Sequence, residues 1–320
     1  MKALVTGGAG FIGSHLVEGL LSSGHDVGVL DDFTTGTESN LANRLGRVNL
    51  HKGSVTDEEF VRRTVKGYEA ILHQAARVSV TRSIDDPLST NRVNADGTLN
   101  LLVAAVDSGV EKFIYASSSS VYGDTPVLPK VETMPTRPIS PYAVSKLTAE
   151  NYCKVFADVY GLNTVSLRYF NVYGPRQRPG QYSGVIPAFT KRALAGEPPV
   201  IFGDGTQTRD FTFVKDAVQA NVLSLEKTVE AGEVFNVGSH RQITLNQLAN
   251  LICSLADRSD LEPIYQPTRT GDVAHSYADI SKISEALGYK PAYTIESGLK
   301  QVVQWFRESA SSDKIPGVSA

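Results

Sequence analysis

Short apolar runs alternate with segments of helical periodicity through the first half of the chain. The apolar runs predict strands, and they lie at residues 3–6, 26–30, 48–52, 70–73, 112–116 and 164–168. Between them, apolar positions recur with helical spacing at 12–22, 57–65, 94–108 and 141–160. Strands that alternate with helices form a parallel sheet whose two faces are both covered by helices. This half of the chain therefore predicts a doubly wound α/β fold.

The pattern changes after residue 170. Proline and glycine clusters indicate loops around a single helix near 186–195. Residues 209–238 predict one more strand–helix–strand unit, and residues up to 308 predict further helices. We expect a first domain over 1–170, a smaller α/β substrate-binding part over 171–308 and a flexible tail over 309–320. In this division, 209–238 is a segment that can return to the first domain.

Composition narrows the class of protein. The chain has 320 residues, 41% of them hydrophobic, and a net charge of −3, which gives no general electrostatic reason to bind nucleic acid or an anionic membrane. Cys153 and Cys253 are too few for a disulfide framework or a four-ligand zinc site. No signal segment or membrane-spanning apolar run stands out. We therefore expect a soluble, cytoplasmic protein without a bound metal.

A glycine-rich turn follows the first predicted strand and precedes the first helix. Gly7 permits the tight turn, Gly10 lets the backbone approach a pyrophosphate, and Gly13 allows close helix–strand packing. The free N–H groups at the helix start would bind the phosphates. This motif predicts a Rossmann-type dinucleotide site.

The acidic residue that ends the second strand selects the dinucleotide. Asp31 lies where a carboxylate accepts hydrogen bonds from the adenosine ribose hydroxyls. The next residues offer no Arg or Lys for a 2′-phosphate, and the adjacent Asp32 would repel one. We therefore expect NAD rather than NADP.

Three polar residues suggest the chemistry. Tyr142 and Lys146 are four residues apart on a predicted helix, so they share one face and the ammonium can favour ionisation of the phenol. Ser118 follows a predicted strand, at the edge where parallel sheets bind ligands. The pattern predicts a general base with a supporting hydroxyl and cation, although any of the serines at 117–120 could be that hydroxyl.

In this combination and order, the motifs resemble the extended short-chain dehydrogenase/reductase family. More narrowly, they resemble UDP-glucose and UDP-N-acetylglucosamine 4-epimerases, over about 1–308. The resemblance implies Ser118, Tyr142 and Lys146 as the catalytic residues and NAD as cofactor. It also implies a cofactor site and a UDP-sugar site beyond the residues named above. The cofactor residues would be Phe11, Ile12, Ser54, Val55, Ala75, Ala76, Asn94 and Tyr169, and the substrate residues Asn171, Val185, Phe202, Arg209, Arg269, Asp272 and Ser276.

One position departs from the family pattern. The usual Gly-Asp-Ile or Gly-Asp-Leu after the third strand is Gly53-Ser54-Val55 here, which weakens the expected contact with adenine.

The resemblance implies that Tyr142 takes the proton of the sugar O4 while NAD accepts hydrogen from C4. The 4-keto sugar then turns about its diphosphate and is reduced on the other face.

Other enzymes of nucleotide sugars remain as alternatives. The 4,6-dehydratases and UDP-glucuronate decarboxylases carry an acid next to the catalytic hydroxyl, whereas this chain has Ser119-Ser120 there. A UDP-glucuronate 4-epimerase stays open, because Arg176 or Arg178 could bind a C6 carboxylate. A non-catalytic NAD-binding module on the same fold is the remaining class.

Two further expectations concern assembly and the sugar. The helices 94–108 and 141–160 carry apolar residues on more than one face, which favours a homodimer like those of the resembled family. These residues are Leu99, Leu101, Leu102, Val103, Val155 and Val159. The resemblance places Ser276 against the C2 substituent of the hexose, where a small residue leaves room for an N-acetyl group.

Overall fold

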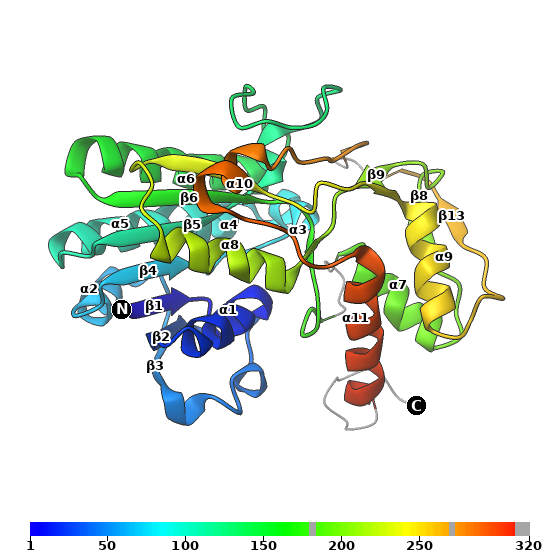
Figure 1. Cartoon of the computed structure of the whole chain (residues 1–320), viewed down its shortest axis with the longest axis horizontal. Coiled ribbons are helices and arrows are strands. Elements are labelled where there is room, and N and C mark those ends of the chain that lie inside the picture. The colour runs from blue at the N-terminus through cyan, green and yellow to red at the C-terminus, as the bar shows by residue number, and fades with distance from the viewer. Residues whose placement is uncertain (179–183, 269–272, 311–320) are drawn as a thin grey trace.

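A seven-stranded parallel sheet forms the centre of the computed structural model, which describes residues 1–178, 184–268 and 273–310 (Figure 1). The strand order is β11-β6-β5-β4-β1-β2-β3. The chain therefore reverses its direction of progress across the sheet between β1 and β4, where α/β sheets bind ligands. The strands are β1 (Lys2–Thr6), β2 (Asp26–Asp31), β3 (Val48–Lys52), β4 (Ala70–His73), β5 (Lys112–Ser118), β6 (Asn163–Tyr169) and β11 (Glu233–Val237).

Helices cover both faces of this sheet. On one face, α1 (Phe11–Ser22) packs against α8 (Val214–Glu226), next to α10 (Ser281–Leu287). On the other face lie α2 (Glu58–Val65), α5 (Gly97–Asp107) and α6 (Pro141–Tyr160). The short helices α3 (Val80–Asp85) and α4 (Pro87–Asn91) contact α6. The predicted doubly wound α/β fold is confirmed.

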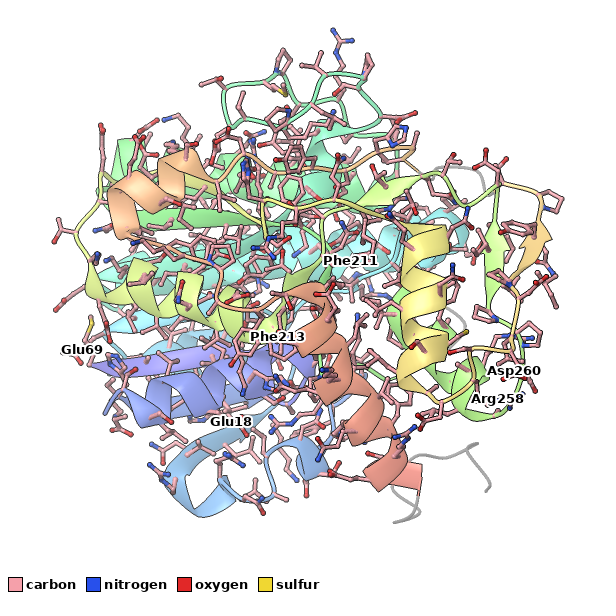
Figure 2. The ribbon with its side chains drawn as sticks, turned by 45° about the vertical axis from the view of Figure 1, so that its right-hand side comes forward. Glu18, Glu69, Phe211, Phe213, Arg258 and Asp260 are labelled. Atoms are coloured by element: carbon pink, nitrogen blue, oxygen red, sulfur yellow. The ribbon has the colours of Figure 1, made fainter. Side chains whose placement is uncertain are left out.

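A smaller lobe lies beyond the carboxyl ends of the strands (Figure 1). Its helices are α7 (Val185–Leu194), α9 (Leu245–Leu255) and α11 (Ile295–Ala310), with β8 (Val200–Phe202) paired to β13 (Ile264–Gln266). Two further short pairs are β7 (Val172–Tyr173) with β10 (Thr212–Phe213), and β9 (Thr208–Arg209) with β12 (Ile243–Thr244). Phe211 and Phe213 belong to the apolar core of this lobe, which α7, α9 and α11 share (Figure 2).

The chain crosses between these two parts more than once. It leaves the sheet after β6, builds α7 and β8, and returns through α8 and β11. Strand β11 pairs in parallel with β6, from Glu233 opposite Val165 to Val237 opposite Tyr169. The strand–helix–strand pattern at 209–238 thus supplies the seventh strand of the sheet.

Two expectations differ in detail from the structure. The helical run predicted at 94–108 is preceded by α4 and by a π-helical turn at Arg92–Asp96, whose wider backbone places Asn94 toward the core. Ser309 and Ala310, which were expected in the tail, belong to α11, and the rest of the expected tail, 311–320, lies outside the described residues. Among the described residues, no helix combines the length and apolarity needed to cross a bilayer.

A buried histidine, His73, ends β4 beside Thr6, the last residue of β1 before the glycine turn. Nδ1 of His73 lies 2.6 Å from the hydroxyl of Thr6, and Nε2 lies 2.9 Å from the hydroxyl of Thr98. The Thr98 hydroxyl donates its own proton to the carbonyl of Asn94, so it accepts from Nε2–H of a neutral imidazole. Burial, together with the nearby Lys146, lowers the pKa of His73 from 6.5 to about 3.

Acid is therefore expected to destabilise the protein through His73. The imidazole binds a proton in the unfolded chain below pH 6.5 but stays neutral in the folded chain, so stability is lost as the pH falls through this range. Between pH 6.5 and about pH 5 this group alone should remove about 2 kcal/mol of unfolding free energy. The unfolding free energy can be measured with denaturant at a series of pH values. Its loss between pH 6.5 and about pH 5 should be smaller in His73→Asn than in the wild type by about 2 kcal/mol. The exposed His240→Asn is the control, and equal slopes in all three proteins would contradict the assignment.

Candidate active site

A cleft of about 650 Å³ opens at the carboxyl ends of the strands, at the point where the strand order reverses. The glycine turn lines one end, and residues of the smaller lobe line the other. Its size fits a ligand larger than a single sugar. Among the described residues, no group of three or more acidic, histidine or cysteine side chains is placed to hold a metal ion.

The glycine turn is shaped by close backbone contacts. Gly7 has a φ of +67°, and a Cβ there would lie 2.7 Å from the backbone nitrogen of Ala75. A Cβ on Gly13 would lie 2.1 Å from the carbonyl oxygen of Gly7. Gly10 caps α1 and, with Phe11 and Ile12, lines the cleft. Only glycine therefore fits at positions 7 and 13. The turn presents the start of α1 to the cleft, as the binding of a dinucleotide pyrophosphate requires.

Asp31 lies at the end of β2, next to this turn. Its carboxylate accepts backbone N–H groups of Ala9 and Phe33, each at 2.8 Å, and these bonds fix its orientation. Burial raises the pKa of Asp31, and the two hydrogen bonds oppose that rise. Asp31, Asp32 and Thr34 all line the cleft. This donor and acceptor set fits a ribose with free hydroxyls rather than a phosphorylated one.

Ser118, Tyr142 and Lys146 come together in the middle of the cleft. Ser118 is the last residue of β5, and its hydroxyl forms a hydrogen bond with the Tyr142 phenol. Tyr142 and Lys146 lie one turn apart on α6, whose start is fixed by Ser140 capping Ala143 and by the bond from the Tyr142 N–H to Ser83. A hydroxyl, a phenol and an amine within one cleft can hold an alcohol oxygen and move its proton.

Burial acts on both reactive side chains of α6. It raises the pKa of the Tyr142 phenol, and the hydrogen bond with Ser118 opposes the rise. It lowers the pKa of Lys146 to about 7. The expectation that the ammonium lowers the phenol pKa is therefore wrong for the protein alone. Burial sets the direction of the Tyr142 shift, and Nζ of Lys146 donates to the Ala116 carbonyl at 2.8 Å.

The remaining predicted residues of the cleft divide between its two ends. Val55, Ala75 and Ala76 line the cofactor end. Tyr169 lines the middle, where its hydroxyl accepts from Asn221 at 2.6 Å and from Gln74 at 3.1 Å. The smaller lobe contributes Asn171, Arg209 and Ser276.

Several predicted residues do not line the cleft. The Ser54 hydroxyl pairs with Thr56, so Gly53 and Val55 line the cleft around it. Asn94 is buried beneath it, where it exchanges hydrogen bonds with the backbone of Arg77 and donates to Ser145. Val185 starts α7 and packs against the core of the smaller lobe, and Phe202 likewise lies outside the lining. Arg269 and Asp272 lie outside the described residues.

Sequence reasoning missed part of the lining. Gln74, Val80 and Arg82 line the cleft from the segment after β4 and from α3. His275 lines it from the smaller lobe, with its Nδ1 2.9 Å from the Thr208 hydroxyl. Helix α3 is only six residues long, too short to give a periodic signal.

Two arginines expected to reach a sugar carboxylate are engaged elsewhere. Arg176 donates to Ser14 and pairs with Glu18, both on α1. Arg178 donates to the hydroxyls of Thr37 and Ser39, on the side of β2. These contacts hold both guanidinium groups near the cofactor end of the molecule rather than near Ser118.

Comparisons with known proteins agree with this geometry. The model of the NAD dependent epimerase/dehydratase family matches residues 3–238. A putative UDP-glucose 4-epimerase of Methanocaldococcus jannaschii is 39% identical, covering 96% of this chain and 98% of its own.

Solved structures give the same result. UDP-glucose 4-epimerase of Thermotoga maritima, crystallised with UDP-glucose, is 42% identical with a TM-score of 0.92, covering 97% of this chain and 99% of its own. UDP-N-acetylglucosamine 4-epimerase of Methanobrevibacter ruminantium, in complex with UDP-N-acetylmuramic acid, is 39% identical with a TM-score of 0.92, covering 96% and 98%. The chain therefore belongs to the NAD dependent epimerase/dehydratase family.

Proposed function

We propose that this protein is an NAD-dependent 4-epimerase of UDP-hexoses that works through a 4-keto sugar. The observation that carries the proposal is the meeting of Ser118, Tyr142 and Lys146 in one cleft with a dinucleotide-shaped glycine turn. The names of the similar proteins, a putative UDP-glucose 4-epimerase, a crystallised UDP-glucose 4-epimerase and a UDP-N-acetylglucosamine 4-epimerase, support the substrate class.

The side chains then have separate tasks. Tyr142 accepts the proton of the sugar O4, Ser118 holds that oxygen by a hydrogen bond, and Lys146 binds the cofactor ribose. Bound NAD supplies an acceptor for the C4 hydrogen and a positive ring charge that opposes the effect of burial on Tyr142. After the 4-keto sugar has rotated, the Tyr142 phenol would return its proton to O4 as hydrogen returns to C4 on the opposite face, which gives the inverted alcohol.

Such a reaction requires a firm hold on UDP and a loose one on the hexose. Asn171 and Arg209 lie in the cleft on the smaller lobe, and both suit a diphosphate. Asn171 is fixed by a bond from its side-chain amide to the Asp210 carbonyl at 2.8 Å. A diphosphate anchored there leaves the sugar free to rotate beside Tyr142.

The lining also bears on reactions that eliminate or decarboxylate. Among the described lining residues, the acids are Asp31 and Asp32, both at the adenosine end. No described carboxylate of the lining therefore stands beside Ser118 to act as the second acid or base that a dehydratase needs. This favours epimerisation without elimination.

A UDP-glucuronate 4-epimerase is the second candidate. Arg77, whose Nη2 also pairs with Asp86 at 3.3 Å, and Arg82 line the cleft, and guanidinium groups bind carboxylates. An assay of C4 inversion with UDP-glucose, UDP-N-acetylglucosamine and UDP-glucuronate, without added reductant, separates the two candidates. Turnover of glucuronate alone would overturn the hexose assignment, and turnover of none of them would remove both.

The purified protein is expected to carry NAD and to need none added. A cofactor that returns to its starting state in each cycle has no reason to leave the site. UDP-glucose alone should therefore sustain turnover, and the extract of the denatured protein should contain NAD. Dependence on added NADP, with indifference to NAD, would show that the argument from Asp31 is wrong.

We further propose that the protein is a homodimer held by α5 and α6. Leu101 and Leu102 face the sheet, whereas Val144, Val155 and Val159 leave an apolar stripe of α6 exposed. Pairing this stripe with its two-fold mate would bury it in a four-helix contact.

Sedimentation of the wild type is expected to give a species of twice the chain mass. The double variant Val155→Glu/Val159→Glu should sediment as a monomer, because it places four carboxylates in the two-fold contact. Val127→Glu, on an exposed residue of another segment, should leave the dimer intact. A monomer at all concentrations of the wild type would contradict the proposed homodimer.

A further inference from the structure

A buried ion pair lies directly behind the candidate catalytic residues. Arg168 of β6 binds Glu150 of α6 through two bonds, Nη2 to Oε1 at 2.6 Å and Nε to Oε2 at 3.0 Å. The two side chains are only 6% and 5% exposed. Burying two charges is costly, and well-packed apolar residues often stabilise a fold equally well. The stability of the fold is therefore a weak reason for this pair.

The pair ties α6 to β6, and its Glu150 also ties α6 to β5 at the level of the reactive groups. Tyr142, Lys146 and Glu150 follow one another at intervals of four residues, so they share one face of α6. The Ser117 hydroxyl of β5 donates to Oε2 of Glu150 at 2.6 Å. On one side of Ser117, the carbonyl of Ala116 accepts a hydrogen bond from Nζ of Lys146. The residue on the other side is Ser118. The Glu150 carboxylate thus fixes β5 against α6 at Ser117, which lies between Ala116 and Ser118.

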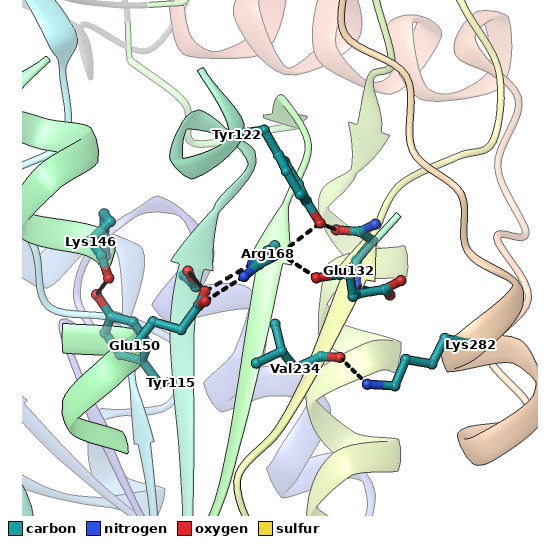
Figure 3. A network of polar contacts seen from close by, with 10 residues as sticks. Tyr115, Tyr122, Glu132, Lys146, Glu150, Arg168, Val234 and Lys282 are labelled. Atoms are coloured by element: carbon teal, nitrogen blue, oxygen red, sulfur yellow. Dashed lines mark hydrogen bonds and ion pairs between the residues drawn. The ribbon is translucent and has the colours of Figure 1, made fainter. Parts of the chain in front are cut away.

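The network also reaches segments whose residues, among them Lys130 and Ser276, line the cleft. Nη1 of Arg168 donates to the Tyr122 hydroxyl at 2.8 Å, and Tyr122 donates to the Asn236 side chain at 2.7 Å (Figure 3). The Asn236 amide donates to the carbonyls of Lys130 and Asp279. Asp279 lies three residues after Ser276. The same guanidinium group therefore connects the two reactive elements to the segment that carries the proposed sugar wall.

We infer that Arg168, Glu150 and Ser117 are positioning residues, which hold Tyr142 and Lys146 of α6 in register with Ser118 of β5. This inference rests on the proposed function for its activity assay. Apolar side chains could fill the same space, but they would supply none of the directional bonds that fix strand, helix and loop together. Misplacement of reacting groups by about 1 Å costs about 100-fold in rate.

The double variant Arg168→Met/Glu150→Leu tests this role. It is neutral in net charge and leaves no unpaired buried ion, so the fold should keep its unfolding temperature within a few degrees. We expect kcat for UDP-glucose to fall about 100-fold while KM changes by less than about twofold. Bound NAD should dissociate from the holoenzyme about tenfold faster, because Lys146 is no longer positioned to bind the cofactor ribose.

Two matched variants complete the experiment. Arg258→Met/Asp260→Leu removes a two-bonded ion pair at the surface of the smaller lobe and should leave kcat and NAD release unchanged (Figure 2). Ser117→Ala removes a single buried hydrogen bond and should lower kcat about fivefold.

The outcomes are distinguishable. Wild-type kcat in the double variant would overturn the inference. If that variant does not fold, wild-type kcat and NAD release in Ser117→Ala would overturn it instead. Absence of epimerisation by the wild type would contradict the proposed function alone. The rate of NAD release would then still test the network, because it requires no sugar.

Discussion

Replacing Tyr142 by phenylalanine is expected to lower kcat for UDP-glucose about 1000-fold, within the range that one acid–base group contributes. The substitution removes the hydroxyl that accepts the O4 proton and keeps the ring that fills the site. The loss of the hydrogen bond with Ser118 affects a single contact of the cleft. The Kd for UDP should therefore change by less than about threefold.

Steady-state inversion at C4 and UDP titration by calorimetry measure the two effects separately. Tyr265→Phe, on an exposed tyrosine of β13, is the matched control and should behave as the wild type. A near-normal rate in Tyr142→Phe would show that another group is the base. A parallel loss of UDP binding would show that the phenol is needed for the shape of the site rather than for proton transfer.

Replacing Ser276 by tyrosine is expected to remove activity on N-acetylated UDP-hexoses while sparing the plain ones. Ser276 lines the cleft, and its backbone N–H is fixed to the Thr208 carbonyl at 3.1 Å, so its side chain has a defined place. A large ring there would exclude an N-acetyl group at C2, whereas extra room costs a smaller sugar little. We expect at least about a 100-fold change in the ratio of the two kcat/KM values.

Rates with UDP-glucose and with UDP-N-acetylglucosamine give this ratio. Ser276→Ala, which keeps the wall small, should leave it unchanged. Equal loss of both activities in Ser276→Tyr would contradict a selective wall. No turnover of the N-acetylated sugar by the wild type would show that another residue sets the limit.

The fold could be predicted from the sequence where elements are long or repeat regularly. Strands β1 to β6 and helix α6 give continuous apolar runs or helical periods, and each was predicted to within a few residues. Helices α3 and α4 were missed, because five or six residues give no period. Their positions depend on contacts with α6 rather than on local sequence.

The candidate site shows the same division. Glycines and the spacing of Tyr142 and Lys146 can be recognised in the sequence because backbone shape and helical spacing constrain them directly. The direction of the Tyr142 pKa could not be predicted, since it depends on how deeply the fold buries the phenol. Nor could the place of Ser54, because its hydroxyl has a nearer partner in Thr56.

The late arrival of β11 has a consequence for how the protein is made. Strand β6 ends at Tyr169, but the strand that covers its free edge begins only at Glu233, after the whole of α7, β8 and α8. During synthesis, β6 therefore presents unpaired N–H and C=O groups for some seconds, at ribosomal rates of about 5–20 residues per second. A nascent chain that stalls in this interval carries an open, aggregation-prone sheet edge. Pausing before codon 233 should therefore lower the yield of soluble protein more than pausing after codon 237.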